Sequence, residues 1–179
     1  MLEVGNSVLV IIDIQEKLAR VMHDRKKLIR SIEKLCTGMG ILEVPAILTE
    51  QYPQGLGPTV TEVISAVKPE NIISKTCFSC CSDDSFMTLL GKMGRTQLIV
   101  AGVEAHICVY QTVADMVCAG YEVYVASDGV SSRTLENKNI GLSLMQLSGA
   151  LITSVETVLF ELLKVAEGEK FRAISRLVK

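Results

Sequence analysis

Short apolar runs alternate along this chain with longer segments in which apolar residues recur at helical spacing. The runs are typical of buried strands and cover residues 7–13, 45–49, 71–75, 96–102, 122–127 and 150–153. Strands that alternate with helices favour parallel pairing, because each parallel crossover needs a helix. The pattern therefore predicts a three-layer, doubly wound α/β fold with a six-stranded, mainly parallel sheet. At 179 residues it predicts one domain over residues 1–179.

Capping residues and apolar stripes mark the predicted helices. Asp24 is the expected N-cap of a helix whose buried face is Leu28, Ile29, Ile32, Leu35, Cys36 and Met39. Thr59 and Glu62 form a capping-box pattern before a second helix, and Ser82 is expected to cap a third that ends at Gly94. Three more helices are predicted, ending near residues 120, 149 and 166. The tail, residues 169–179, is expected to dock as a short helix through Phe171, Ile174 and Leu177, on this subunit or a neighbour.

Composition narrows the possible partners. The net charge is −2, with 18 basic and 20 acidic residues, which gives no basic patch of the kind that nucleic acid requires. No apolar run approaches the ~20 residues of a membrane span, and the first strand begins too close to Met1 for a signal peptide. The six cysteines follow no regular framework, which indicates reduced thiols. We therefore expect a cytoplasmic protein with a small-molecule substrate and neither a nucleic-acid nor a membrane partner.

Polar residues stand at the carboxyl ends of three predicted strands. Asp13 ends the first strand, Lys75 ends the third, and Cys108 follows the fourth near the start of a helix. Ligands bind at this edge of doubly wound sheets, so the three side chains are expected to lie within ~3–5 Å of one another. An aspartate, a lysine and a cysteine form a coherent nucleophilic device, in which Asp13 takes the thiol proton and Lys75 stabilises the thiolate.

The position of Cys108 predicts an activated thiol. A helix start offers unpaired N–H groups and the positive end of the helix dipole, and both favour the thiolate. The nearby Lys75 acts in the same direction, whereas Asp13 opposes it. We predict that Lys75 and the helix dipole together outweigh the opposing effect of Asp13, so that the pKa of Cys108 lies below the ~8.5 of a free cysteine. The N–H groups of the turn before Cys108 are candidates for holding a developing oxyanion.

Three segments carry a family resemblance: VIIDIQEKL with Asp13, IISKTCFS with Lys75 and VAGVEAHICV with Cys108. Together they resemble the isochorismatase-like cysteine hydrolases, over almost the whole chain. TEQYPQGLGPT, residues 49–59, resembles the branch of small isochorismatase-domain or MAR1-type proteins. The resemblance implies a catalytic triad of Asp13, Lys75 and Cys108. It also implies a cis peptide between Val103 and Glu104 that aims backbone N–H groups at the oxyanion.

The resemblance also bears on cofactors and on the bond that is broken. Family amidases that act on nicotinamide carry an aspartate and two histidines after the second strand, whereas this chain reads Thr-Glu-Gln-Tyr from Thr49 and has histidine only at positions 23 and 106. We therefore expect no metal and no other cofactor. Family members that cleave a vinyl ether lack the nucleophilic cysteine. Cys108 thus favours hydrolysis of a C–N bond through a thioester.

Four residues near these strand ends are candidates for binding substrate: Gln51, Tyr52, Phe78 and Glu104. Tyr52 and Phe78 follow strands, where aromatic residues suit a pocket wall. Glu104 is equally compatible with a position facing solvent. His106 is expected near the nucleophile and contributes there through its backbone N–H alone or through its ring as well.

Each of these assignments has a structural alternative. Cys108 also suits a small buried side chain, Asp13 a helix cap, and Lys75 the surface. Cys77, Cys80 and Cys81 suggest half a zinc site or a redox pair, although zinc needs about four ligands and no second cluster supplies them. Two other functions therefore remain beside the hydrolase: a binding or assembly protein with little turnover, and a thiol redox module. The high apolar content and the tail stripe also predict a homo-oligomer.

Overall fold

The computed structural model describes residues 1–67 and 72–179, so Asn71 of the predicted third strand lies outside the described residues. The strands are β1 (Ser7–Ile12), β2 (Ala46–Gln51), β3 (Ile72–Lys75), β4 (Gln97–Val103), β5 (Glu122–Ser131) and β6 (Leu151–Thr153). The helices are α1 (Glu16–Arg20), α2 (Arg25–Leu42), α3 (Pro53–Leu56), α4 (Thr61–Val67), α5 (Asp84–Met93), α6 (Tyr110–Cys118), α7 (Leu135–Leu147), α8 (Val155–Leu163) and α9 (Gly168–Val178). Short helical turns complete the list: η1 (Val4–Asn6), η2 (Cys80–Ser82) and the π-helical η3 (Ala105–Val109).

The six strands form one sheet in the order β3-β2-β1-β4-β5-β6, and every pair of neighbours is parallel. The predicted doubly wound α/β fold is thereby confirmed. The chain winds outward from β1 to β3 and then returns to build β4 to β6 on the other side. The direction of winding changes between β1 and β4, and the crevice at the carboxyl ends of these strands is where such sheets bind ligands.

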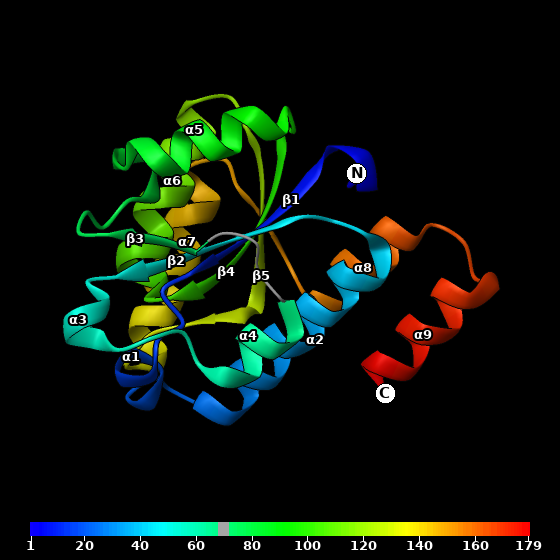
Figure 1. Ribbon diagram of the computed structural model, residues 1–179, viewed down its shortest axis with the longest axis horizontal. Coiled ribbons are helices and arrows are strands. Elements are labelled where there is room, and N and C mark those ends of the chain that lie inside the picture. Colours follow the sequence, from blue (N-terminus) through cyan, green and yellow to red (C-terminus); the bar gives the residue numbers. More distant parts are fainter. Residues whose placement is uncertain (68–71) are drawn as a thin grey trace.

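Helices cover both faces of the sheet (Figure 1). The helices α2, α4, α8 and α9 lie on one face, and α5, α6 and α7 lie on the other. Strands β1 and β4 are buried throughout, and successive residues of β1 alternate between the two apolar clusters: Leu9 and Ile11 join one, and Val8 and Val10 the other. Burial on both faces explains why these strands read as continuous apolar runs.

The predicted docking of the tail is confirmed, and it occurs on this subunit. Helix α9 lies beside α2 and α8 (Figure 1), with Ile174 completely buried. Leu177 packs against the same cluster, and Phe171 is half-buried. Much of the apolar stripe that suggested association is therefore covered within the chain.

Of the three predicted helix caps, Asp24 is in place and the other two are wrong. Asp24 is the N-cap residue of α2, although its backbone is left-handed, φ 48°, and its side chain makes no cap hydrogen bond. Thr59 donates both its N–H and its hydroxyl to Glu50 Oε1, at 2.7 and 2.8 Å, and α4 begins only at Thr61. Asp83 caps α5 by accepting from Phe86 N, while Ser82 belongs to η2. For Thr59 and Ser82 a neighbouring acceptor or turn competes with the local capping pattern.

Two predicted element lengths also differ. Helix α8 ends at Leu163, because Lys164 turns the backbone to positive φ. Strand β5 runs on to Ser131 instead of stopping at residue 127, and β6 pairs with it only from Tyr124 to Ala126. The last residues of β5 therefore extend past the edge strand. No helix in the two described ranges is long and apolar enough to cross a membrane.

Candidate active site

Asp13 is the first residue after β1, and its carboxylate is completely shielded from solvent. Its Oδ2 lies 2.7 Å from Lys75 Nζ, and its Oδ1 accepts a hydrogen bond of 2.8 Å from Thr49 Oγ1. The sheet register places Thr49 for this contact, since Thr49 is the β2 partner of Ile12, the residue before Asp13. Both carboxylate oxygens thus have partners inside the sheet edge.

Lys75 ends β3 and reaches past β2 to Asp13. Its ammonium also donates to Gln51 Oε1 at 2.9 Å and to the carbonyls of Cys77 and Phe78 at 3.2 and 3.3 Å. Burial acts to lower the pKa of Lys75, but the Asp13 carboxylate and the nearby thiols outweigh it and hold the pKa above its ordinary value. Lys75 is therefore a buried, fully partnered cation.

Cys108 lies in η3, directly after β4, and only 7% of its surface is exposed. Burial, first of all, raises the pKa of the thiol from 9.0 to about 12. Asp13 raises it further, by its negative charge and as the acceptor of a hydrogen bond from the thiol, while Lys75 acts in the opposite direction. The structure therefore brings Asp13, Lys75 and Cys108 together at one sheet edge.

The prediction of an acidic Cys108 is wrong for the resting protein. The helix start and Lys75 favour the thiolate, but the fold also removes water from around the sulfur. Desolvation disfavours the charged form, and the charge of Lys75 is already balanced by Asp13 at 2.7 Å. At neutral pH the resting site therefore holds a neutral thiol beside a carboxylate that can accept its proton.

The loop after β3 is tied to the segment that carries Cys108. Thr112 Oγ1 donates to Cys108 O at 2.7 Å and accepts from Cys80 N at 3.0 Å. Ser79 Oγ donates to Asp115 Oδ2 at 2.6 Å. These bonds hold the loop that follows Lys75 against η3, which carries Cys108, and the first part of α6.

Cys80 belongs to the same buried cluster. It is completely buried, and its thiol donates to Thr49 Oγ1 at 3.8 Å. Burial raises its pKa to about 11 although Lys75 opposes the shift. Cys77 and Cys81 are half-buried, and all six cysteines are free thiols. The three cysteines of this loop therefore differ in burial: Cys80 is inaccessible to solvent, whereas Cys77 and Cys81 are partly exposed.

The turn before Cys108 has a cis peptide between Val103 and Glu104. The carbonyl of Glu104 accepts from the N–H groups of Ile107 and Val109, at 3.0 and 3.2 Å. The Glu104 carboxylate accepts from the backbone and the guanidinium of Arg133, at 3.1 and 3.2 Å. The predicted substrate-binding role of Glu104 is therefore in competition with an ion pair that its carboxylate already makes.

The remaining predicted residues surround this centre. Tyr52 and Phe78 follow β2 and β3, and 55% of the surface of each is exposed. Gln51 is tied to the centre by accepting from Lys75, and its amide donates to Thr76 O at 2.8 Å. His106 Nδ1 lies 3.0 Å from Ser132 Oγ, so its ring also has a partner.

Among the residues that the structure describes, no group of three or more His, Cys, Asp or Glu side chains is arranged to hold a metal ion. Glu50, the carboxylate near the end of β2 where the metal region is expected, is buried and bound by Thr59. The residues present do not form the histidine-containing site of the nicotinamide-type amidases.

Sequence reasoning missed three residues that hold the site together. Thr49 bonds Asp13, and Thr112 bonds Cys108. Gln15 is completely buried and bonds both the N–H and the carbonyl of Gln51, at 2.8 and 3.0 Å. Thr112 offered a signal, since a hydroxyl four residues after Cys108 on a helix reaches its carbonyl. Thr49 and Gln15 depend on the strand order, which local sequence does not carry.

Comparison with known proteins agrees with this geometry. Residues 7–157 match the family model of the isochorismatase domain. The isochorismatase domain-containing protein 2 of Danio rerio is 34% identical, over 99% of this chain and 89% of that protein. A structure titled MAR1 ribonuclease from Caenorhabditis elegans is also 34% identical, with a TM-score of 0.92 over 99% of this chain and 91% of that one.

A more distant structure shares the fold alone. The YcaC gene product of Escherichia coli, titled an octameric hydrolase of unknown specificity, is 21% identical, with a TM-score of 0.93 over 98% of this chain and 88% of that one. The matched domain covers the strands that carry Asp13, Lys75 and Cys108. The chain therefore belongs to the isochorismatase family, which supports its assignment as a hydrolase.

Proposed function

We propose that this protein is a metal-independent cysteine hydrolase that cleaves the C–N bond of a small amide-like substrate through a thioester on Cys108. One observation carries the proposal: the Cys108 thiol lies against the buried Asp13 carboxylate, which in turn pairs with Lys75 at 2.7 Å. A buried cation, a carboxylate and a thiol in contact supply a base, its counter-charge and a nucleophile.

Attack by a neutral thiol requires a proton acceptor in the same step. As the sulfur of Cys108 bonds to the substrate carbonyl carbon, its proton passes to Asp13, which accepts hydrogen bonds from Thr49 and Lys75. Lys75 stabilises the negative charge that moves between the thiol and the carboxylate. Asp13 then gives the proton to the departing nitrogen, the C–N bond breaks, and an acyl thioester remains.

Water completes the cycle by hydrolysing the thioester. Asp13 takes a proton from water as the oxygen attacks the thioester carbonyl, and the proton returns to the sulfur as the S–C bond breaks. The developing oxyanion needs N–H donors, and the first turn of a helix provides them. Ile107 and Val109 N–H already bond Glu104 O, so we assign this task to the N–H of Cys108 in η3, which follows the cis peptide between Val103 and Glu104.

Gln51, Tyr52, Phe78 and Glu104 are proposed to contact the substrate. Tyr52 and Phe78 are the best suited, because their exposed rings flank the strand ends. We also propose a cytoplasmic location, which six free thiols support. No contact among the described residues specifically favours a binding protein or a redox module. Membership of a hydrolase family favours the enzyme.

The decisive experiment is a screen of carboxamides, carbamates and ureas for ammonia release, with RNA added to the panel because of the ribonuclease title of the C. elegans structure. We expect turnover of a small C–N substrate. Mass spectrometry should also show an acyl adduct on Cys108, which treatment with hydroxylamine removes because hydroxylamine cleaves thioesters. Cys108→Ala should remove both, at a cost of at least ~10³ in rate. Cleavage of RNA that survives in Cys108→Ala, with no C–N substrate turned over, would overturn the proposal.

A matched control separates the nucleophile from the other thiols. Cys118 is exposed and lies at the end of α6, away from the ion pair. Cys118→Ala should retain full activity. Cys80→Ala should keep the acyl adduct on Cys108, which would exclude a disulfide mechanism in which Cys80 is an obligatory partner.

A further inference from the structure

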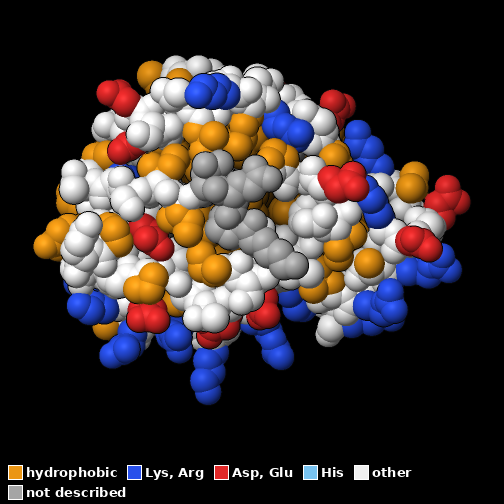
Figure 2. Space-filling view, viewed as in Figure 1, with side chains coloured by type: hydrophobic (Ala, Val, Ile, Leu, Met, Phe, Trp, Pro, Cys, Tyr) orange, Lys and Arg blue, Asp and Glu red, His pale blue; other side chains and the backbone are white. Residues whose placement is uncertain are grey.

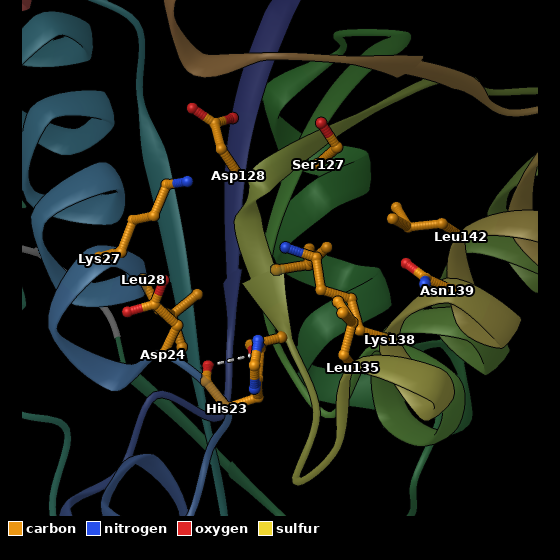
Figure 3. Close-up of a pocket in the computed structure, with 12 residues that line it drawn as sticks. His23, Asp24, Lys27, Leu28, Ser127, Asp128, Leu135, Lys138, Asn139 and Leu142 are labelled. Atoms are coloured by element: carbon orange, nitrogen blue, oxygen red, sulfur yellow. Dashed lines mark hydrogen bonds between the residues drawn. The ribbon is translucent and has the colours of Figure 1, made fainter.

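A second hollow lies apart from the thiol centre, at the end of β5 that extends beyond β6. It has a volume of about 350 Å³, within the ~300–1,000 Å³ of ordinary ligand pockets. The start of α2 forms one wall and the first half of α7 the other, with Ser127 and Asp128 of β5 at the back (Figure 3). Neither Asp13 nor Cys108 lines it.

Two lysines project into this hollow from opposite walls. Figure 3 shows Lys27 reaching in from α2 and Lys138 from α7. Within residues 1–67 and 72–179, the ion pairs of the structure involve neither of them. Ser127 and Asn139 add a hydroxyl and a carboxamide to the lining. Two ammonium groups without an ion-pair partner thus share one concave surface with neutral polar groups.

Neither of the carboxylates that line the hollow forms an ion pair with these cations within the described residues. Asp24 and Asp128 both line it, and Asp128 Oδ1 accepts from Val155 N at 2.8 Å, at the N-terminus of α8. Burial, first of all, lowers the pKa of Lys138; Lys27 acts in the same direction, and Asp128 and Asp24 act to raise it. In the part of the chain that the structure describes, Lys138 is therefore a partly desolvated ammonium group with no carboxylate at ion-pair distance, and a bound anion would supply that partner.

The surroundings are also basic. Lys27 and Asp128 line a smaller hollow of about 220 Å³ that continues toward α9, and its lining has three basic side chains, Lys27, Arg30 and Lys34, against two acidic ones, Asp128 and Glu156. Figure 2 shows Lys and Arg side chains gathered along the lower edge of the molecule, where Figure 1 has α1 and the start of α2. This concentration of positive charge attracts small anions toward the hollow.

We propose that the hollow between α2, β5 and α7 is a binding site for a small carboxylate or phosphate anion, held between Lys27 and Lys138. The two ammonium groups bond the anionic oxygens, and Ser127 and Asn139 donate to what remains. Leu135 and Leu142 offer an apolar wall for a short carbon chain. The site is separate from the Cys108 centre and does not depend on the hydrolase reaction.

The test is a titration of the ¹⁵N-labelled full chain with inorganic phosphate and, in parallel, with acetate, followed by NMR at an ionic strength held constant with NaCl. We expect saturable shifts at residues 127–131 and 135–142, with a Kd of about 1 mM for the better anion. The two anions distinguish a phosphate site from a carboxylate site. Lys138→Met and Lys27→Met should each weaken binding about tenfold or more.

Three variants make the result decisive. Lys26→Met removes an exposed neighbouring lysine outside the hollow and should leave the affinity unchanged. Lys138→Arg keeps the cation and should bind within a few-fold of the original chain. Cys108→Ala should bind as the original chain does, so failure of the hydrolase and failure of this site are distinguishable. Absence of saturable shifts, or an equal loss in Lys26→Met, would overturn the proposal.

Discussion

Lys75 Nζ and Asp13 Oδ2 form an ion pair of 2.7 Å, and both side chains are completely buried. Removing one member leaves the other as an unpaired buried charge, which costs about 3–5 kcal/mol. We therefore predict that Lys75→Met and Asp13→Asn each lower the free energy of unfolding by about this amount. Asparagine suits the positive φ of 53° at position 13, so backbone strain should not contribute.

A double-mutant cycle checks this, with urea unfolding as the measurement. The variant with both substitutions should be more stable than the sum of the single losses predicts, by about 2 kcal/mol or more. Additive losses would mean that the two groups do not stabilise each other.

The pKa of the Cys108 thiol should respond in opposite directions to the same two substitutions. Asp13 raises this pKa and Lys75 lowers it. Asp13→Asn should therefore lower the thiol pKa below about 12 and speed alkylation by iodoacetamide at pH 8 to 9, while abolishing turnover through loss of the proton acceptor. Lys75→Met should slow alkylation.

The pH dependence of labelling, with mass spectrometry to identify the modified cysteine, measures both effects. Exposed Cys118 serves as the internal reference. Faster labelling of Cys108 in Lys75→Met would contradict the arrangement of charges described here.

Stability should fall as the solution becomes alkaline. Burial raises the pKa of Cys36 from 9.0 to about 12, and the thiols of Cys80 and Cys108 are raised to about 11 and about 12. Because the unfolded chain loses these protons first, the stabilisation is fully present below pH ~9 and is lost as pH rises toward the folded values. Each thiol contributes up to ~1.4 kcal/mol per pH unit to the slope.

Urea unfolding between pH 8 and 10.5 measures that slope. Cys36→Ala should make it shallower, whatever its effect on absolute stability, and Cys118→Ala should leave it unchanged. An unchanged slope in Cys36→Ala would show that the buried thiol does not contribute.

Gly141 is a sensitive contact between α7 and the nucleophile turn. A Cβ at this position would lie 2.5 Å from the carbonyl carbon and oxygen of Ala105 and 2.7 Å from His106 N. Gly141→Ala should therefore displace η3, lower stability by about 1–3 kcal/mol and reduce turnover.

Gly91→Ala on α5 is the matched control. A Cβ there would meet nothing within 4 Å, so the substitution should stabilise the helix by about 0.5–1 kcal/mol. Thermal unfolding and the ammonia assay together distinguish the two variants. Full activity in Gly141→Ala would mean that the turn tolerates displacement.

We also predict a homo-oligomer, although the tail stripe no longer supports it. Other apolar side chains remain exposed: Leu147 at 84% and Leu151 of the edge strand β6 at 55%. Light scattering at micromolar protein should give a mass above the 19.5 kDa of one chain; a mass of one chain would contradict the prediction.

The fold was predictable because its signals are local. Apolar runs gave the six strands, and the periodic residues of α2, Leu28 to Met39, are the buried ones in the structure. The positions of Asp13, Lys75 and Cys108 followed from the parallel arrangement of strand ends.

The unpredicted features depend on contacts between distant segments. The local pattern predicts a helix cap at Thr59, but Glu50 of β2 accepts a hydrogen bond from its hydroxyl in the folded protein. The direction of the Cys108 pKa depended on how much water the fold removes from the sulfur. The hollow at Lys138 is lined by the part of β5 that extends beyond its pairing with β6. No local sequence pattern indicates where an edge strand ends.

The difference in burial between the ion pair and the two aromatic rings has a consequence for how this scaffold evolves. Tyr52 and Phe78 expose more than half of their surface, so exchanging them removes little packing. If these rings contact the substrate as proposed, mutations there can alter which molecules bind while the proposed catalytic groups Asp13, Lys75 and Cys108 stay unchanged. One restriction applies: Tyr52 has φ 38°, so β-branched replacements are disfavoured at that position. Randomising both positions should therefore yield mostly folded variants, and selection can sort them by substrate.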